Sequence, residues 1–271
     1  MTQFDKIISL FKSNQELSIK DISDVTWIKE PNIRRILWQW TLWWVFKRIC
    51  KWVYSLKNWD TEIWFINWDA LEVVKHLDIK FDLIFLDIPY NTPAVIWGNR
   101  WVKYDLISID QFNIFLNDLK NCVKDDTYIV HCFSNAPSWM KKMMQYNNKI
   151  TNNWFKLISE NTWSKITKDW NPCTNMRWNI MPPEWINIYS LSWKQIDYSK
   201  NFCMAKTKTA SQKPYELIKE LFLVLMKKWQ WMLDPFAWTW ITWLVSYDIW
   251  INSIIIEKSF DRFYNEILLL N

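Results

Sequence analysis

The 271-residue sequence predicts an α/β fold, in which helices cover a mostly parallel sheet, preceded by a small helical domain. Three observations predict this architecture. From about residue 60 onward, short apolar runs alternate with amphipathic helical segments. Residues 1–57 lack this alternation and instead have short helical patterns followed by a hairpin pattern. Half of all residues are hydrophobic, which is enough to bury one large core and a smaller one.

The segment 1–57 contains three helical patterns and one alternating pattern. The helical patterns cover residues 4–11, 18–26 and 30–37, and the alternating one covers residues 45–56. This order resembles the winged helix-turn-helix domains of DNA-binding proteins. The second helix of that motif enters the major groove, so the resemblance implies that Asn32, Arg34 and Arg35 lie near DNA. The alternative is a small three-helix module with solvated arginines.

Residues 58–271 are expected to form the second domain. Its strands are expected at residues 62–67, 81–87, 127–133, 231–237 and 251–257. Its helices are expected at residues 69–77, 104–123 (after a polar loop), 212–228, 241–249 and 259–270. The stretch from about 139 to 205 is less regular and rich in Asn, Lys, Thr and Trp.

Glycine and tryptophan usage is abnormal, with one glycine (Gly98) and 24 tryptophans. Average composition would give roughly 19 glycines. Tryptophans stand where turns call for glycine, as in 228–231 and 238–240. A bulky residue tolerates positive φ poorly and keeps the backbone away from a ligand. We hypothesise that most of these tryptophans are native glycines, encoded by UGA and translated as tryptophan. A truly tryptophan-rich protein is the alternative, and Trp163 is typical of a real tryptophan.

Two motifs carry chemistry in the second domain. Asp87-Ile88-Pro89-Tyr90 ends the apolar run 81–87, and ligands of open α/β sheets bind at the carboxyl ends of strands. The other motif spans 233–242 and, with glycine at 238 and 240, contains DPFAGTGIT. This is a strand, a glycine turn and a helix start, which allow a nucleoside-containing ligand to lie against the backbone.

With both motifs in this order, the chain resembles the DNA amino-methyltransferases, which act on adenine N6 or cytosine N4. Their catalytic motif is [D/N/S]-P-P-[Y/F/W], and their cofactor motif resembles DPF-x-G-x-G-T-T. The segment 67–72 precedes the catalytic motif, and Gln212-Lys213-Pro214 stands between the two motifs, in an order similar to that of the β group. The resemblance implies a Rossmann-like S-adenosylmethionine-dependent methyltransferase fold for residues 58–271.

The resemblance also assigns a catalytic role to Asp87, Ile88, Pro89 and Tyr90. The target base is flipped out of the duplex, because its amino group is unreachable while paired. Asp87 and the main-chain carbonyl of Ile88 would accept hydrogen bonds from that amine, and Tyr90 would stack on the base. In-line methyl transfer then needs positioning and no covalent intermediate. Ile88 replaces the first proline of the family motif, so the carbonyl is kept and some rigidity is lost.

The implied cofactor is S-adenosylmethionine. Asp234 and the backbone of 236–240 would line its methionine part, and Glu257 would bind its ribose. Asp69 is expected near its adenine end and Lys213-Pro214 near its amino-acid end. Real tryptophans at 238 and 240 would fill this site. The full expected set is Asp69, Lys213, Pro214, Asp234, Pro235, Phe236, Ala237, Trp238, Thr239, Trp240, Thr242 and Glu257.

Residues 139–205 fall where the family has its target-recognition region. Their basic residues could contact phosphates and base edges, namely Lys141, Lys142, Lys165, Lys168 and Arg177. A solvated surface insertion is the alternative.

Composition sets further bounds on function. The net charge of +5 suits a double-stranded DNA partner but is shared by many proteins. The five cysteines form no C-x-x-C pair, so we expect reduced thiols and no metal site. His76 and His131 are expected to be structural. We find no apolar run long enough to span a membrane and no cleavable secretion signal, and we expect a cytoplasmic protein.

The sequence therefore predicts a DNA (adenine-N6) methyltransferase of the restriction-modification type, because aspartate at the first motif position favours adenine. Cytosine N4 methylation is the nearest alternative. A non-catalytic DNA-binding regulator with a decayed methyltransferase domain is another, supported by Ile88 and the tryptophans of the cofactor turn. Methylation of an RNA or protein substrate is a third alternative.

The codons of the tryptophans test the glycine hypothesis directly. We expect UGA at most of the 24 positions and UGG at Trp163. Sequencing the gene decides the question, because UGG at the turn positions would show that the tryptophans are real.

Overall fold

The structure is a computed structural model. It describes residues 53–57, 61–66, 68–88, 94–96, 100–102, 107–134, 137–167, 169–174, 183–192, 196–205, 213–237 and 241–258. The chain divides into two compact units, Met1–Asn58 and Trp59–Asn271. In the first unit the described element is β1 (Val53–Lys57). The rest of the predicted winged helix-turn-helix, including Asn32, Arg34 and Arg35, lies outside the described residues.

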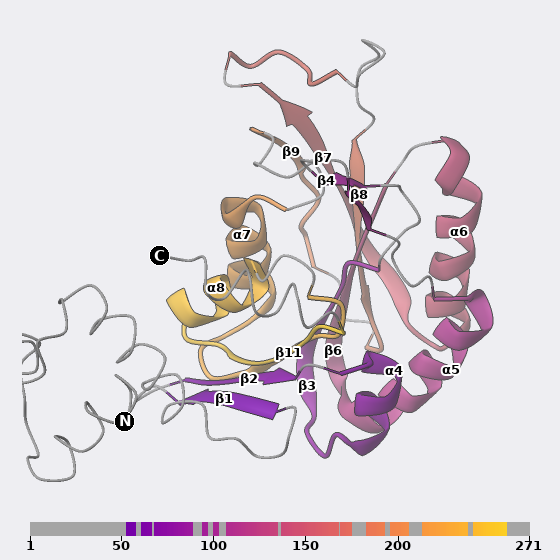
Figure 1. The fold of residues 1–271 in the computed structure, drawn as a ribbon, viewed down its shortest axis with the longest axis vertical. Coiled ribbons are helices and arrows are strands. Elements are labelled where there is room, and N and C mark those ends of the chain that lie inside the picture. The colour runs from indigo at the N-terminus through magenta and orange to yellow at the C-terminus, as the bar shows by residue number, and fades with distance from the viewer. Residues whose placement is uncertain are drawn as a thin grey trace, which may run out of the picture. The chain divides into compact units, whose positions relative to one another are not determined.

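The second unit is built on a mixed sheet (Figure 1). Its strands are β2 (Glu62–Ile66), β3 (Phe81–Leu86), β6 (Val123–Ser134), β7 (Lys156–Ile166), β8 (Glu184–Ser190), β9 (Asn201–Ala205), β10 (Trp231–Asp234) and β11 (Asn252–Ile256). They follow the order β2-β11-β10-β3-β6-β8-β7-β9. From β2 to β6 all neighbours pair parallel, whereas β8 runs antiparallel to both β6 and β7. β4 (Ala94–Ile96) and β5 (Arg100–Val102) form a separate antiparallel pair.

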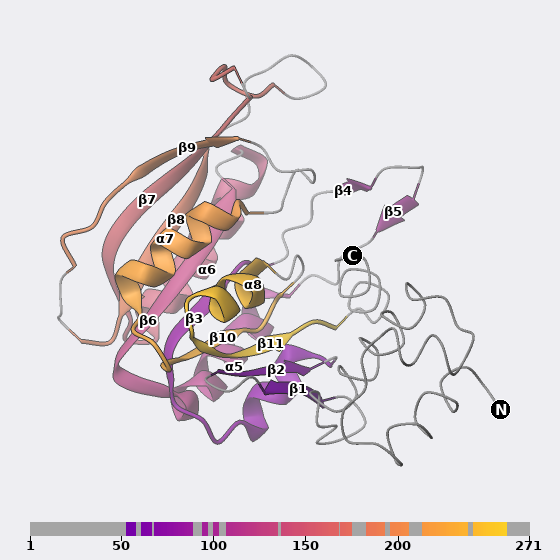
Figure 2. The ribbon, with the colours of Figure 1, turned by 90° about the vertical axis from the view of Figure 1, so that its left-hand side faces the viewer.

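Helices cover both faces of this sheet (Figures 1 and 2). On one face lie α4 (Ala70–Val73), α5 (Ile109–Leu119) and α6 (Pro137–Asn152), and on the other lie α7 (Tyr215–Leu225) and α8 (Ile241–Asp248). The 3-10 turn η1 (Val74–His76) follows α4 in the chain, and η2 (Lys120–Cys122) follows α5. Every residue of β3 is buried, as expected for a parallel strand covered on both sides. The layered α/β architecture and the parallel strands from β2 to β6 agree with the alternating pattern, whereas the antiparallel strand β8 was not predicted.

The stretch 139–205 is more regular than its sequence indicated, since it forms most of α6 and the strands β7, β8 and β9. The inward face of β7 explains the difference: the buried residues Ser159, Asn161 and Lys165 are polar. Their polar groups are satisfied inside the protein, and Asn161 for example accepts a hydrogen bond from the Lys200 amide at 2.7 Å. A strand with polar residues facing inward gives no apolar alternation that a sequence pattern could detect. The helix predicted at 259–270 lies outside the described residues.

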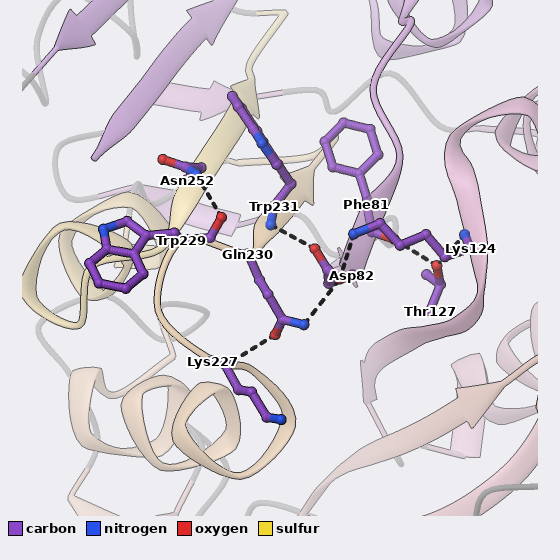
Figure 3. A network of polar contacts seen from close by, with 9 residues as sticks. All are labelled: Phe81, Asp82, Lys124, Thr127, Lys227, Trp229, Gln230, Trp231 and Asn252. Atoms are coloured by element: carbon purple, nitrogen blue, oxygen red, sulfur yellow. Dashed lines mark hydrogen bonds and ion pairs between the residues drawn. The ribbon is translucent and has the colours of Figure 1, made fainter. Parts of the chain in front are cut away.

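A buried carboxylate ties three strands together at the amino-terminal end of β3 (Figure 3). Asp82 accepts hydrogen bonds from the Lys124 ammonium at 2.6 Å, the Gln230 amide at 3.1 Å and the backbone N–H of Trp231 at 2.9 Å. Lys124 belongs to β6 and Trp231 to β10, so one side chain links β3 to both of its neighbours. This arrangement, called the Asp82 anchor below, fixes the strands at the edge opposite to their carboxyl ends.

Four tryptophans adopt the left-handed backbone conformation: Trp154 (φ 77°), Trp170 (62°), Trp229 (63°) and Trp250 (66°). In the part of the chain that the structure describes, every non-glycine residue with positive φ is a tryptophan. Trp250 follows α8 in a Schellman motif, with Ile251 N–H bonded to the Ser246 carbonyl at 2.9 Å; glycine normally occupies this position. All four side chains are exposed, whereas Trp163 is fully buried. The backbone therefore supports the hypothesis that turn tryptophans stand at glycine positions.

We predict that Trp250→Gly is more stable than Trp250→Ala by about 1 kcal/mol, because only glycine avoids the steric cost of the left-handed region. Both variants lose the same ring, so their difference isolates the backbone effect. Urea unfolding of the two variants measures it. At Trp163, in strand β7, glycine should give no advantage over alanine. Equal stabilities of the two Trp250 variants would contradict the glycine assignment.

Candidate active site

Acidic residues gather at the carboxyl ends of adjacent parallel strands. Asp87 follows β3, Asp234 ends β10 and Glu257 follows β11. β10 continues through α8 to β11 on one side, while β3 continues through α5 to β6 on the other. The sheet therefore has its topological switch point between β10 and β3, which is where open α/β sheets bind their ligands.

The turn after β10 is organised by Asp234. Its carboxylate accepts hydrogen bonds from the Phe236 N–H at 3.1 Å and the Thr242 hydroxyl at 2.6 Å. The Ala237 N–H binds the Ile256 carbonyl at 3.0 Å, which fastens the turn to β11. Thr242, predicted to bind cofactor, thus supports Asp234 through its hydroxyl. Burial raises the pKa of Asp234 to about 7, against the hydrogen bonds from Thr242 and Phe236, and the nearby Asp87 and Glu257 add to the rise.

Asp87 is held by a buried lysine. The Lys213 ammonium donates to both of its carboxylate oxygens, at 2.8 and 2.7 Å. The same ammonium lies 3.1 Å from Glu184 Oε2, and Glu184 Oε1 accepts from Lys165 at 2.5 Å. The four side chains, called the charge chain below, are 11%, 1%, 4% and 6% exposed in the order Asp87, Lys213, Glu184, Lys165.

Burial and neighbouring charges set the ionisation of this chain. Burial raises the pKa of Asp87; Lys213 counteracts the rise, and the like charge of Glu184 adds to it. Burial also opposes ionisation of Glu184, but Lys213 and Lys165 together hold its pKa below the usual range. Glu184 is therefore the firmly ionised carboxylate of the two, because it lies between two cations.

Asp69 and Glu257 lie at the β2 side of the site. Asp69 caps α4 by accepting from the Leu71 N–H at 3.0 Å, and Lys258 Nζ is 3.1 Å from its carboxylate. The Glu257 N–H binds the Ile66 carbonyl at 3.0 Å, which joins the ends of β11 and β2. The predicted adenine and ribose contacts thus stand next to each other along one sheet edge.

The structure places the other predicted residues as follows. Ile88, Pro214, Pro235 and Ala237 are buried, and Phe236 packs its ring against Phe115 with centroids 5.5 Å apart. Lys213, expected at the amino-acid end of a cofactor, has its ammonium on Asp87. The remaining predicted site residues lie outside the described part of the chain, namely Pro89, Tyr90, Trp238, Thr239 and Trp240.

Sequence reasoning missed Glu184 and misassigned Lys165. The proposed phosphate contact of Lys165 is wrong, since its side chain is buried and paired with Glu184. Glu184 begins the antiparallel strand β8, opposite Ser134 at the carboxyl end of β6. Because β8 runs antiparallel to β6, its first residue lies at the edge where β6 ends. Because no pattern in the sequence marked β8 as antiparallel, nothing pointed to Glu184.

His131 is buried in the sheet, where its Nδ1 lies 2.7 Å from Asn147 Oδ1. Burial lowers its pKa to about 4, so the ring is neutral. Among the described residues no group of His, Cys, Asp and Glu is arranged to hold a metal ion. No helix in the described segments is long and apolar enough to cross a membrane.

No family model and no curated protein matches this sequence. Solved structures match the fold. The match to the M1.HpyAVI–SAM complex covers 76% of this chain and 98% of that one, at 18% identity and a TM-score of 0.55. The match to the cytosine-N4-specific PvuII DNA methyltransferase covers 77% and 86%, at 14% identity and a TM-score of 0.59. The match to TTHA0409 from Thermus thermophilus, in complex with S-adenosyl-L-methionine, covers 73% and 90%, at 14% identity and a TM-score of 0.54. This likeness shows that the chain shares the Rossmann-like fold of these solved structures, as predicted for residues 58–271.

The raised pKa of Asp234 predicts a pH-dependent stability. Its folded value of about 7 exceeds the ordinary 3.8, so between these pH values the folded state binds more protons than the unfolded state. The free energy of unfolding should therefore fall as pH rises through this window, by at most about 4 kcal/mol from this group.

Asp234→Asn should remove that part of the slope. Urea unfolding at pH 5 and pH 8 measures it, with Asp125→Asn, an exposed aspartate before the buried part of β6, as the control that keeps the wild-type slope. If Asp234→Asn and the wild type lose stability equally with pH, burial of Asp234 does not control its protonation.

Proposed function

We propose that the chain is an S-adenosylmethionine-dependent DNA methyltransferase that methylates adenine at N6. The observation that carries this proposal is the position of the two sequence motifs. Asp87 and Asp234, 147 residues apart in the chain, end the adjacent strands β3 and β10 at the topological switch point. A methyl donor and a methyl acceptor must meet, and these strand ends bring the expected cofactor turn and the expected base site together.

The charge of the site fits a cationic cofactor. Asp234 is 3% exposed, and Asp87 and Glu257 both favour its protonated form. A cluster of buried carboxylates that repel each other is stabilised by a positive ligand. S-adenosylmethionine carries a sulfonium and an ammonium, and it would supply an activated methyl group when bound. Asp234, Glu257 and Asp69 are the residues proposed to hold it.

Asp87 can still accept a hydrogen bond from an amine although it is paired with Lys213. A carboxylate has about four lone-pair positions, and Lys213 uses one on each oxygen. A further hydrogen bond from the exocyclic amine of a flipped adenine would orient its nitrogen toward the methyl group. The main-chain carbonyl of Ile88 is proposed as the second acceptor, and Tyr90 as the side chain that stacks on the base.

Cytosine N4 is the second candidate acceptor. It is favoured by the likeness to the cytosine-N4-specific PvuII enzyme, whose fold matches this chain with a TM-score of 0.59. Adenine N6 and cytosine N4 are both exocyclic amines on an aromatic ring, so Asp87 and the Ile88 carbonyl could accept hydrogen bonds from either one. Aspartate at the first position of the motif favours adenine in our proposal.

Double-stranded DNA is the proposed partner, and the cytoplasm the proposed location. Recognition is assigned to the first unit, with Asn32, Arg34 and Arg35, and to the residue range 139–205. Because β7, β8 and β9 of that range belong to the sheet, the proposed contacts shift to the chain segments that join these strands, which contain Lys168 and Arg177. Lys141 and Lys142, on α6, remain candidates.

The test is nucleoside mass spectrometry of DNA incubated with S-adenosylmethionine and the full chain. The chain with all 24 of its tryptophans is compared with a version, called the glycine version, that carries Trp238→Gly and Trp240→Gly. We expect N6-methyladenine from the glycine version and little or none from the other, because two indoles would fill the turn. Asp87→Ala in the glycine version should lower the rate at least about 100-fold.

Asp125→Asn, a change of an exposed carboxylate outside the site, is the matched control and should keep the rate. N4-methylcytosine as the product would retain the fold and reassign the substrate. Absence of any methylated base on varied DNA from all versions would overturn the proposed activity and favour a DNA-binding regulator.

A further inference from the structure

We propose that Lys213 and Glu184 are positioning residues, in which Lys213 orients the Asp87 carboxylate and keeps it charged, and Glu184 holds Lys213 in place. The role of Asp87 in this inference rests on the proposed function. The contacts themselves follow from the structure.

Four segments distant in sequence build the charge chain, with Lys165 supplied by β7. Asp87 comes from the end of β3, Lys213 from the residue before the cap of α7, and Glu184 from the start of β8. Lys213 bonds both oxygens of Asp87, so the carboxylate plane is fixed relative to the amino-terminal end of α7. A carboxylate held through both oxygens cannot rotate freely, so each remaining lone pair keeps a fixed direction, which is what alignment of an amine for in-line transfer requires.

Glu184 holds Lys213 in place and also repels the Asp87 carboxylate directly. It lies 3.1 Å from the Lys213 ammonium, and its other oxygen accepts from Lys165 at 2.5 Å. The side chains of Lys213 and Glu184 are 1% and 4% exposed, so water cannot replace either partner. Loss of one partner leaves a buried charge, and the other side chains must then shift or change protonation.

The ionisable groups around Asp87 have opposite effects on its pKa. Lys213 and Lys165 favour its charged form, and Glu184 disfavours it. Asp234 and the buried Cys132 thiol also interact with it. Removing the Lys213 charge should therefore raise the pKa of Asp87, whereas neutralising Glu184 should lower it. A salt bridge that only stabilises the fold would also shift the pKa of Asp87, so the pH dependence of methyl transfer is what distinguishes a positioning role from a structural one.

The experiment follows the Asp87 carboxyl carbon by NMR during pH titration of the full chain, with Asp87→Asn to assign the signal. In Lys213→Met, the ratio of ionised to protonated Asp87 at a fixed pH should fall at least about tenfold. In Glu184→Gln, which keeps the side-chain shape, the ratio should rise. Lys200→Met removes a lysine from the surface pair with Glu220 and should leave the ratio unchanged.

Methyl transfer by the glycine version provides the second measurement. The acid limb of the pH–rate profile should move to higher pH in Lys213→Met and to lower pH in Glu184→Gln. Lys213→Arg, which keeps the charge, should restore part of the rate at neutral pH. Superimposable titrations and profiles for the wild type and both folded variants would overturn the inference.

The failure of the proposed function has a different signature. In that case Asp87 titrates with opposite shifts in the two variants, but no version methylates DNA and Asp87→Ala changes nothing. If Lys213→Met does not fold, the inference is tested with Glu184→Gln only. An unchanged titration of Asp87 in Glu184→Gln then counts against it.

Discussion

The ion pair between Lys213 and Asp87 joins the two halves of the site. It connects the end of β3 to the start of α7, so it can form only when α7 is packed on the sheet. Burying charges is costly, and the cost is offset only when each charge keeps its partners. Lys213 meets this condition by lying between Asp87 and Glu184, and Glu184 meets it by lying between Lys213 and Lys165. The site is therefore a product of the complete fold.

Because the site depends on Glu184, the direction of β8 is important for it. As an antiparallel strand between β6 and β7, it turns its first residue, Glu184, toward the edge where the parallel strands end. A parallel strand at this place would bring its last residue there instead. The change of direction thus adds a carboxylate from outside the two sequence motifs.

The central parallel strands could be predicted from the sequence, and the outer part of the sheet could not. The runs that form β2, β3, β6, β10 and β11 are apolar, so their type followed from the pattern. Asp87, Asp234 and Glu257 lie at or directly after the ends of β3, β10 and β11, so their positions followed as well. β7 escaped prediction because Ser159, Asn161 and Lys165 face inward. Lys213 was predicted to lie in the site, but its partner depends on a contact between residues 126 positions apart, which local patterns do not encode.

The Asp82 anchor has a consequence for how such a domain can be modified. It fixes β3 to β6 and β10 at one edge of the sheet, whereas the charge chain lies at the other edge. The contacts of Asp82 that align the strands and the ion pairs of the charge chain thus lie at opposite ends of β3. The register of β3 with β6 and β10 is therefore expected to survive the loss of a side chain at the carboxyl edge, because the Asp82 contacts at the opposite ends of these strands remain.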